Sequence, residues 1–447
     1  MSTAPQQRAP ERMARRAGIA SLIGTTIEWY DFYIYGTAAA LVFSKLFFPN
    51  LSNALGIVAA FATFWVGFLA RPLGAVFFGH LGDRAGRKIA LVVTLVLTGG
   101  ATTLIGALPT AEAIGALAPI LLIVLRMIQG FALGGEWGGA VLIAAEHAPA
   151  QKKVLYASIA QVGAPIGLCL AMASFFLLSF MSDANFLAWG WRLPFLASGV
   201  LLVVGLVIRL RLEETPEMKN VVQNRATSRL PLKEVLTTSP MVVILAIGAC
   251  TIGGSSMYFK TTFALSWATT SLDYSRSTFL ALGALVAAVS IVAMPYGAVL
   301  ATKFGIKRIA VCALASEAVL LPVMFALINT ESTALAAIGL ALATIPNSMY
   351  YAVIAGMLAN AFPARVRYTG ISVSYQLCGA VLVGTTPMVA QYFLDVSGSI
   401  IPVVVFALAQ LLLSLVCAIA LLRRTGGHQT DSATTDTDSV AMATGGQ

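Results

Sequence analysis

Two carboxylates within the first long apolar segment, Glu28 and Asp31, are the residues of this chain that first suggest chemistry. An ionisable side chain in hydrocarbon costs at least about 2.5 to 3.5 kcal/mol, so such residues usually face a protein-lined cavity and have a partner nearby. The two are three positions apart and share a helical face, with Tyr35 a further turn along it. We therefore expect the rest of the chain to build a cavity around this face and to supply the partner.

A basic counterpart lies in a later, glycine-rich segment. At about 100° per residue, Arg126, Gln129 and Glu136 fall within one helical stripe. Gly130 and Gly134 beside them allow a neighbouring helix to approach closely. One interpretation is an internal salt bridge that only positions helices. Intramembrane charges more often have a functional role, which favours a site that meets the two carboxylates.

The second half of the chain adds candidates with open alternatives. Lys260 lies well inside an apolar run, where it would attract an anionic substrate or extend its ammonium group to the membrane surface. For Glu317, we prefer a private salt bridge, or a position outside the apolar span, to a coupling role. Hydrogen-bonding side chains that are candidates for the cavity wall, although each alone is more often a packing residue, are Gln161, Asn347, Tyr350, Tyr351, Tyr375 and Gln376.

The elements that position these residues are predicted from composition. The chain has 447 residues, of which 58% are hydrophobic and 11% charged, far below the charged fraction of about 25% in soluble domains. Apolar runs of bilayer-spanning length recur, so we predict an all-α membrane protein. The twelve predicted transmembrane segments are 18–40, 54–78, 88–108, 115–145, 154–181, 191–210, 239–268, 277–301, 308–328, 333–359, 369–395 and 399–422.

The net charge of +9 reflects topology rather than nucleic-acid binding. Basic residues gather before the first segment and in every second loop, whereas the alternate loops carry mostly acidic residues. The positive-inside rule therefore places both termini in the cytoplasm. The five cysteines fall in different apolar segments without paired or metal-ligand spacing, so we predict no metal site.

A weak internal repeat divides the chain in two. The loop at 79–88 contains Gly82, Asp83 and Gly86, and a fainter copy follows the second segment of the other half at 298–308. Two parallel six-helix repeats would place the substrate site between them. The predicted parts are a cytoplasmic segment 1–17, a six-helix bundle 18–211, a cytoplasmic linker 212–238, a second bundle 239–422 and a disordered cytoplasmic tail 423–447.

Several motifs resemble those of a known family. The loop Gly-His-Leu-Gly-Asp-Arg-Ala-Gly-Arg-Lys at 79–88 resembles the signature of the major facilitator superfamily. Further motifs resemble the metabolite:proton symporter family and its shikimate-transporter-like branch. They are Glu-Trp-Tyr-Asp at 28–31, Arg-Pro-Leu-Gly at 71–74, Arg-Met-Ile-Gln-Gly at 126–130 with Gly-Gly-Glu at 134–136, Trp-Gly-Trp-Arg-Leu-Pro at 189–194, and Phe-Pro-Ala-Arg-Val-Arg at 362–367.

The resemblance implies proton-coupled import of an organic acid or a zwitterionic osmolyte. In the predicted mechanism Asp31, in a network with Glu28, Arg126 and Glu136, binds and releases the coupling proton. Protonation weakens its pairing with Arg126, whose planar donor fork is then free to hold a substrate carboxylate. The loop residues Gly82, Asp83, Arg84, Gly86 and Arg87 would form a conformational latch. The residues predicted to complete the substrate site around Arg126 are Tyr35, Gln129, Gln161, Lys260, Asn347, Tyr351, Tyr375 and Gln376.

Other functions are less well supported by the sequence. A proton-driven exporter would have the same fold. A membrane sensor would be expected to carry a substantial cytoplasmic output domain, and an intramembrane enzyme would need a nucleophile or metal set that the sequence lacks. We therefore expect a monomeric, multi-pass transporter of a bacterial inner membrane, with a small-molecule substrate, protons and the lipid bilayer as partners and no cofactor besides the coupling proton.

Overall fold

The computed structural model describes residues 5–85, 87–134, 153–210, 231–362 and 367–444, and every regular element in these ranges is a helix. In lipid, each backbone N–H and C=O group must find its partner within the protein, and a helix satisfies them within one segment. Eleven of the described helices are long and apolar enough to cross a membrane. The remaining predicted segment, 18–40, lies mostly in α1 (Pro5–Ala38), which carries Glu28 and Asp31 and packs inside the bundle.

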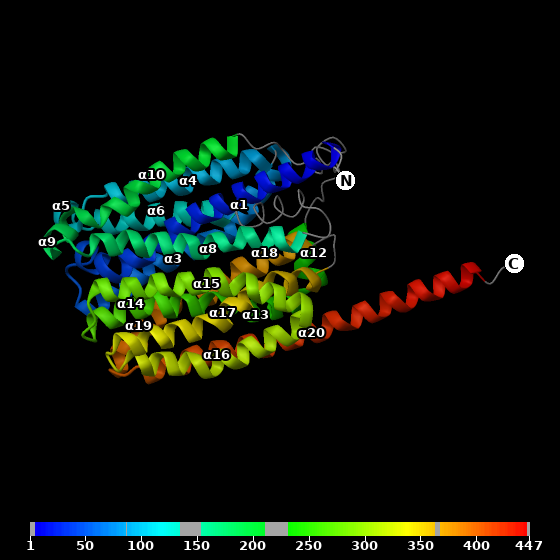
Figure 1. The fold of residues 1–447 in the computed structure, drawn as a ribbon. Helices are drawn as coiled ribbons and strands as arrows, with labels where there is room; N and C mark the ends of the chain where they lie inside the picture. Colours follow the sequence, from blue (N-terminus) through cyan, green and yellow to red (C-terminus); the bar gives the residue numbers. More distant parts are fainter. Residues whose placement is uncertain (1–4, 86, 135–152, 211–230, 363–366, 445–447) are drawn as a thin grey trace.

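The chain forms two six-helix halves, which lie one above the other in Figure 1. The long helices of the N-terminal half are α1, α3 (Asn53–Ala85), α4 (Arg87–Ala107), α6 (Leu117–Gly134), α8 (Lys153–Leu178) and α10 (Arg192–Leu210). Those of the C-terminal half are α13 (Pro240–Tyr258), α15 (Arg276–Phe304), α16 (Ile306–Ile328), α17 (Thr333–Ala361), α18 (Arg367–Cys378) with α19 (Thr386–Ser397), and α20 (Ile401–Thr444). The predicted all-α membrane fold with twelve helices is confirmed.

Shorter helices connect or extend the long ones. They are η1 (Ala39–Phe43), α2 (Ser44–Phe47), α5 (Ala111–Ile114), α9 (Asp183–Asn185), η3 (Phe186–Gly190), α12 (Pro231–Thr238), η4 (Phe259–Phe263), α14 (Ala264–Thr270) and η5 (Gly379–Val383). The π-helical segments η4 and η5 interrupt the helices that run from α13 to α14 and from α18 to α19. Such bulges are frequent at functional sites.

The two halves meet along two seams. One is formed by α8 against α15, and the other by α3 against α18, η5 and α19. At the bundle end opposite both termini (Figure 1), Arg276 of α15 pairs with Asp183 of α9 at 3.1 Å. Deeper in the seam, the Trp65 Nε1–H donates to the Ala380 carbonyl at 2.7 Å. The halves are thus in direct contact while they remain separate helical bundles.

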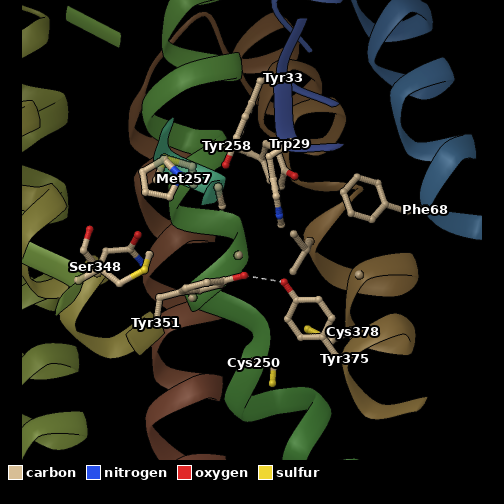
Figure 2. Close-up of a pocket in the computed structure, with 18 of the residues that line it drawn as sticks. Trp29, Tyr33, Phe68, Cys250, Met257, Tyr258, Ser348, Tyr351, Tyr375 and Cys378 are labelled. Atoms are coloured by element: carbon tan, nitrogen blue, oxygen red, sulfur yellow. Dashed lines mark hydrogen bonds between the residues drawn. The ribbon is translucent and has the colours of Figure 1, made fainter. Parts of the chain in front are cut away.

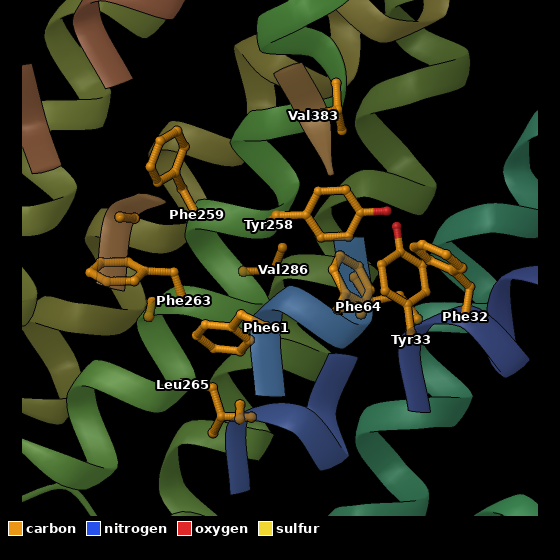
Figure 3. Close-up of a cluster of buried hydrophobic side chains, with 14 of the residues drawn as sticks. Phe32, Tyr33, Phe61, Phe64, Tyr258, Phe259, Phe263, Leu265, Val286 and Val383 are labelled. Carbon is orange, nitrogen blue, oxygen red and sulfur yellow. The ribbon is translucent and has the colours of Figure 1, made fainter. Parts of the chain in front are cut away.

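An aromatic cluster fills the space where the halves meet (Figure 3). Tyr258 of the C-terminal half lies among Phe32, Phe64 and Phe68 of the N-terminal half, with ring centroids 5.3 to 6.2 Å apart. Offset and edge-to-face aromatic pairs at such distances are attractive. The centre of the interface is therefore held by ring packing.

Close approach of α3 and α6 depends on glycine, as the sequence predicts. A Cβ atom on Gly130 would overlap the carbonyl oxygen of Gly67, and one on Gly134 would overlap that of Arg71. Glycine is thus required at both positions for the two backbones to touch. This contact brings the polar stripe of α6 directly against α3.

The C-terminal end differs from the sequence-based expectation. The tail at 423–447 is predicted to be disordered, but α20 continues as helix to Thr444 and projects away from the bundle in Figure 1. After Pro402 the sequence contains no proline that would break this helix. Within the predicted linker at 212–238, α12 is helical, and residues 211–230 lie outside the described ranges.

Candidate substrate and proton sites

A pocket lies between the halves and receives side chains from both (Figure 2). The volume open to the centre of a water-sized sphere is about 50 Å³, and all the empty space in the pocket, open solvent included, is about 690 Å³. The lining residues of the N-terminal half are Trp29, Tyr33, Phe68, Arg71, Ala164 and Pro165. Those of the C-terminal half are Cys250, Gly253, Gly254, Met257, Tyr258, Met294, Asn347, Ser348, Tyr351, Tyr375, Cys378, Gly379 and Val383.

The pocket wall is aromatic with a few hydrogen-bonding groups. Tyr351 and Tyr375 approach from α17 and α18, and their hydroxyl groups are hydrogen-bonded at 2.8 Å (Figure 2). Asn347 also lines the pocket and donates from Nδ2 to the Ile252 carbonyl at 3.4 Å. Three residues chosen from the sequence as cavity lining therefore do face this pocket.

Arg71 is the charged residue of the pocket wall. It lies near the middle of α3, is 7% exposed, and its guanidinium carbon stands 4.5 Å from the ring centroid of Phe32 and 4.3 Å from that of Phe68. Within the described ranges it forms no ion pair or hydrogen bond, and its buried Nε–H has no acceptor. The cation is thus held by aromatic faces and directed to the pocket.

Asp31 is enclosed by hydroxyl groups rather than by a cation. Its Oδ1 accepts from the Ser198 hydroxyl at 2.5 Å, and its Oδ2 accepts from the Thr102 hydroxyl at 3.1 Å. Both side chains come from other helices of the same half, α10 and α4. The carboxyl group is fully buried and does not line the pocket.

Arg126 reaches Asp31 through two intermediates. Its guanidinium donates to the Gln129 Oε1, and Gln129 Nε2 donates to the Thr102 hydroxyl at 2.8 Å. The predicted direct pairing of Arg126 with Asp31 is therefore absent, because Gln129 and Thr102 occupy the space between them. Arg126 is fully buried and stands over the Tyr35 ring at 4.1 Å, so it does not line the pocket.

Phe32 connects the network to the pocket. One ring packs against two guanidinium groups, that of Arg71 at 4.5 Å and that of Arg126 at 4.4 Å. Its neighbours in sequence are Asp31 on one side and the pocket residue Tyr33 on the other. A single aromatic side chain thus contacts both cations.

Glu28 has a partner that the sequence did not suggest. Its Oε1 pairs at 3.1 Å with Arg209, which lies within α10 and is buried. In the sequence Arg209 lies at the very end of the predicted segment 191–210, beside the basic residues of the linker, and so did not stand out as an interior charge. Glu28 therefore forms an ion pair of its own beside the Asp31–Arg126 chain, and Glu136 lies outside the described residues.

Lys260 and Glu317 are paired inside the C-terminal half. The Lys260 Nζ lies 3.5 Å from the Glu317 Oε1, both side chains are fully buried, and the Ser256 hydroxyl donates to the same carboxylate. Lys260 thus does not reach the membrane surface, because its partner on α16 holds it in the interior. Neither residue lines the pocket, and the private salt bridge expected for Glu317 is present.

The remaining candidates are dispersed. The Tyr35 hydroxyl donates to that of Thr63 at 2.7 Å, and Gln161 is half-buried on α8. Gln376 donates to the Gly134 carbonyl at 3.3 Å and so joins the two halves. Of the predicted latch, Gly86 is not described, and the side chains of Asp83, Arg84 and Arg87 fall outside what the structure describes, although 82–84 lie at the end of α3 and Arg87 begins α4.

Four aromatic pocket residues and one cation were not predicted as site residues from the sequence: Trp29, Tyr33, Phe68, Tyr258 and Arg71. Arg71 was visible as a charge within the second apolar segment, by the same criterion that selected Arg126. The aromatic residues gave no comparable signal, because such side chains are common throughout an apolar chain.

Similarity to known proteins establishes the family. A family model described as "Sugar (and other) transporter" matches residues 17–229. The shikimate transporter of Escherichia coli (strain K12) is 42% identical over 415 residues, which cover 91% of this chain and 94% of that protein. The chain belongs to the major facilitator superfamily. Within it, the chain is a member of the metabolite:proton symporter family, in the shikimate-transporter-like branch that its motifs predict.

Other relatives agree with this placement. The inner membrane metabolite transport protein YhjE of E. coli (strain K12) is 36% identical, covering 87% of this chain and 89% of that protein. The proline/betaine transporter of the same strain is 32% identical, with 86% and 78% covered. The crystal structure of a D-xylose-proton symporter has the same fold, with a TM-score of 0.72 at 17% identity, and covers 91% of this chain and 96% of that one. The chain is therefore a multi-pass membrane transporter and not an enzyme.

Proposed function

We propose that this chain is a proton-coupled symporter that imports a small organic acid, such as a shikimate-like carboxylate, by alternating access. The observation that carries the proposal is the position of Asp31. It is a fully buried carboxyl group held by two hydroxyls, on the helix whose flanking residues Trp29 and Tyr33 line the pocket between the halves. A protonatable group and a solute site on one helix are what coupled transport requires.

Proton binding at Asp31 would rearrange its hydrogen-bond chain. The Thr102 hydroxyl has one hydrogen and two acceptors within reach, Asp31 Oδ2 at 3.1 Å and the Thr98 carbonyl at 2.8 Å. When Asp31 gains a proton it no longer needs that donor, and the hydroxyl turns to Thr98. Thr102 accepts from Gln129, which accepts from Arg126, so the change reaches the guanidinium packed on Phe32.

The transport cycle follows from the two-half architecture. The halves touch along α8 with α15 and α3 with α18–α19, and rocking about these seams would expose the pocket alternately to each side. In the proposed orientation both termini are cytoplasmic in a bacterial inner membrane, since basic residues concentrate in the loops at that end. One chain contains a complete pocket between its own halves, which suits a monomer.

Import of a zwitterionic osmolyte is the second candidate. The aromatic side chains of Trp29, Tyr33, Phe68 and Tyr258 line the pocket, and such faces attract a quaternary ammonium group. A proline/betaine transporter is also among the relatives. Shikimate is preferred because the charged group of the pocket wall, Arg71, would repel the ammonium group of a betaine.

Uptake into proteoliposomes tests this function. Purified protein is reconstituted, an inward proton gradient is imposed, and accumulation of labelled shikimate and of labelled glycine betaine is measured with and without a protonophore. We expect accumulation of shikimate that the protonophore abolishes. Preference for glycine betaine would support the second candidate, and accumulation only under an outward gradient would indicate an exporter. Accumulation that is insensitive to the protonophore would contradict proton coupling.

A further inference from the structure

Arg71 carries a buried positive charge for which the protein supplies no direct counter-ion in the described ranges. It is 7% exposed and its Nε–H lacks an acceptor. The other buried cations each have a partner: Arg209 pairs with Glu28, Lys260 pairs with Glu317, and Arg126 donates to Gln129 and to the Phe64 carbonyl. Arg71 is thus the exception among buried cations of the described residues.

The surroundings of Arg71 compensate its charge only in part. A guanidinium over an aromatic face gains about 0.5 to 2 kcal/mol, and Arg71 has two such faces, Phe32 and Phe68. Glu28 is close enough for its charge to act on Arg71, but its carboxylate is engaged with Arg209. Removing a cation from water without a hydrogen-bonded partner costs several kcal/mol. An anion entering the pocket would remove that deficit.

We propose that Arg71 binds the carboxylate of the transported solute, in the role that the sequence suggested for Arg126. The inference rests on the proposed function, since it uses the same pocket. Arg71 lines that pocket whereas Arg126 does not, because Arg126 is enclosed by Gln129, Tyr35 and Phe64. The stacking on Phe32 and Phe68 fixes the plane of the guanidinium, so that its donor fork is presented in one orientation.

The pocket also accommodates the rest of such a solute. The hydroxyls of Tyr351 and Tyr375 and the amide of Asn347 come from the C-terminal half, whereas Arg71 comes from the N-terminal half. A solute with a carboxylate and hydroxyl groups would therefore bridge the two halves. Such a solute would contact both bundles at once, so that its binding could affect how the two bundles move relative to each other.

Binding without any ion gradient tests the inference separately from transport. Four purified proteins are compared: wild type, Arg71→Gln, Arg71→Lys and the control Lys45→Gln, which removes an exposed lysine. Each is heated with increasing concentrations of shikimate, methyl shikimate or glycine betaine. The measurement is the ligand concentration that gives half of the maximal rise in melting temperature. Methyl shikimate lacks the anionic carboxylate, and glycine betaine combines a carboxylate with a cation. The melting temperature without ligand reports whether each variant is folded.

We expect shikimate to protect wild type and Lys45→Gln at lower concentration than methyl shikimate does. In Arg71→Gln the half-maximal concentration of shikimate should rise at least about tenfold, because a buried charge pair is lost. The half-maximal concentration of methyl shikimate should not change. Arg71→Lys should fall between, since it keeps the charge without the fork. If glycine betaine protects wild type and this protection is lost in Arg71→Gln, the carboxylate that Arg71 binds belongs to a zwitterionic solute. If no carboxylate protects wild type, or if Arg71→Gln retains the preference for shikimate over its ester, the inference is wrong.

Discussion

Buried charges in this transporter are compensated in three different ways. Glu28 and Glu317 each pair with a cation from another helix. Asp31 is stabilised by neutral hydroxyl donors, which leaves it free to accept a proton without breaking a salt bridge. Arg71 relies on aromatic faces and on the proposed substrate carboxylate. Charges that are paired within the protein are thus suited to stability, whereas Asp31 and Arg71, which lack a direct ion pair in the described ranges, are suited to transport.

The ion pair of Lys260 and Glu317 is expected to act in stability. Lys260→Met leaves the Glu317 carboxylate buried without its cation, and breaking a buried pair in this way costs about 3 to 5 kcal/mol. The double variant Lys260→Met, Glu317→Gln removes both charges and should recover most of the loss. Thermal unfolding of the purified proteins measures this. Equal melting temperatures for the single and double variants would contradict the role assigned to the pair.

Phe32 is the residue that links coupling to binding in this account. Its ring contacts both the proposed substrate cation, Arg71, and the cation of the proton network, Arg126. Two like charges against one ring repel each other unless at least one is neutralised. A bound carboxylate at Arg71 would therefore favour a different state of the Asp31 network than an empty pocket does.

At the level of elements, the contact between α3 and α6 holds the polar stripe in place. Gly130→Ala would place a methyl group against the Gly67 backbone, which cannot yield as a side chain can, so we expect a clear loss of folded protein and a lower melting temperature. Gly100→Ala is the matched control, because a Cβ there meets nothing within 4 Å. Size-exclusion profiles and melting temperatures compare them. A Gly130→Ala protein as stable as Gly100→Ala would show that the close contact is not needed.

The sequence predicted the elements well because hydropathy and helix length are local properties. The predicted segment at 239–268 corresponds to the span Pro240–Thr270, and that at 308–328 to Ile306–Ile328. The ends are less well predicted where composition changes gradually. The tail was predicted to be disordered although α20 continues through it.

The site was predicted only in part, for a physical reason. Periodicity shows which residues share a helical face, but it does not show which neighbouring helix that face meets. It therefore grouped Arg126 with Gln129 correctly and assigned them to the pocket wall, whereas both lie inside the N-terminal half. Likewise, nothing in the sequence joins Lys260 to Glu317, because their contact depends on how α16 packs against η4.

At the level of the whole molecule, the proposed latch at the inner end of α3 and α4 would stabilise the outward-facing state. Asp83→Ala should destabilise the outward-facing state relative to the inward-facing state. Net uptake should therefore be slower, while substrate still binds. Uptake and exchange rates in proteoliposomes, compared with the exposed-site control Lys45→Gln, measure the effect. Normal cycling of Asp83→Ala through both orientations would contradict the latch.

The central claim is that protonation of Asp31 is coupled to movement of an organic acid through the pocket. Proteoliposomes containing a trapped pH-sensitive dye and no imposed gradient test it most directly, when shikimate is added outside and internal pH is followed. The account predicts internal acidification with wild type and none with Asp31→Asn, although Asp31→Asn still exchanges labelled for unlabelled shikimate. Acidification by Asp31→Asn at the wild-type rate, or shikimate entry through wild type without acidification, would contradict it.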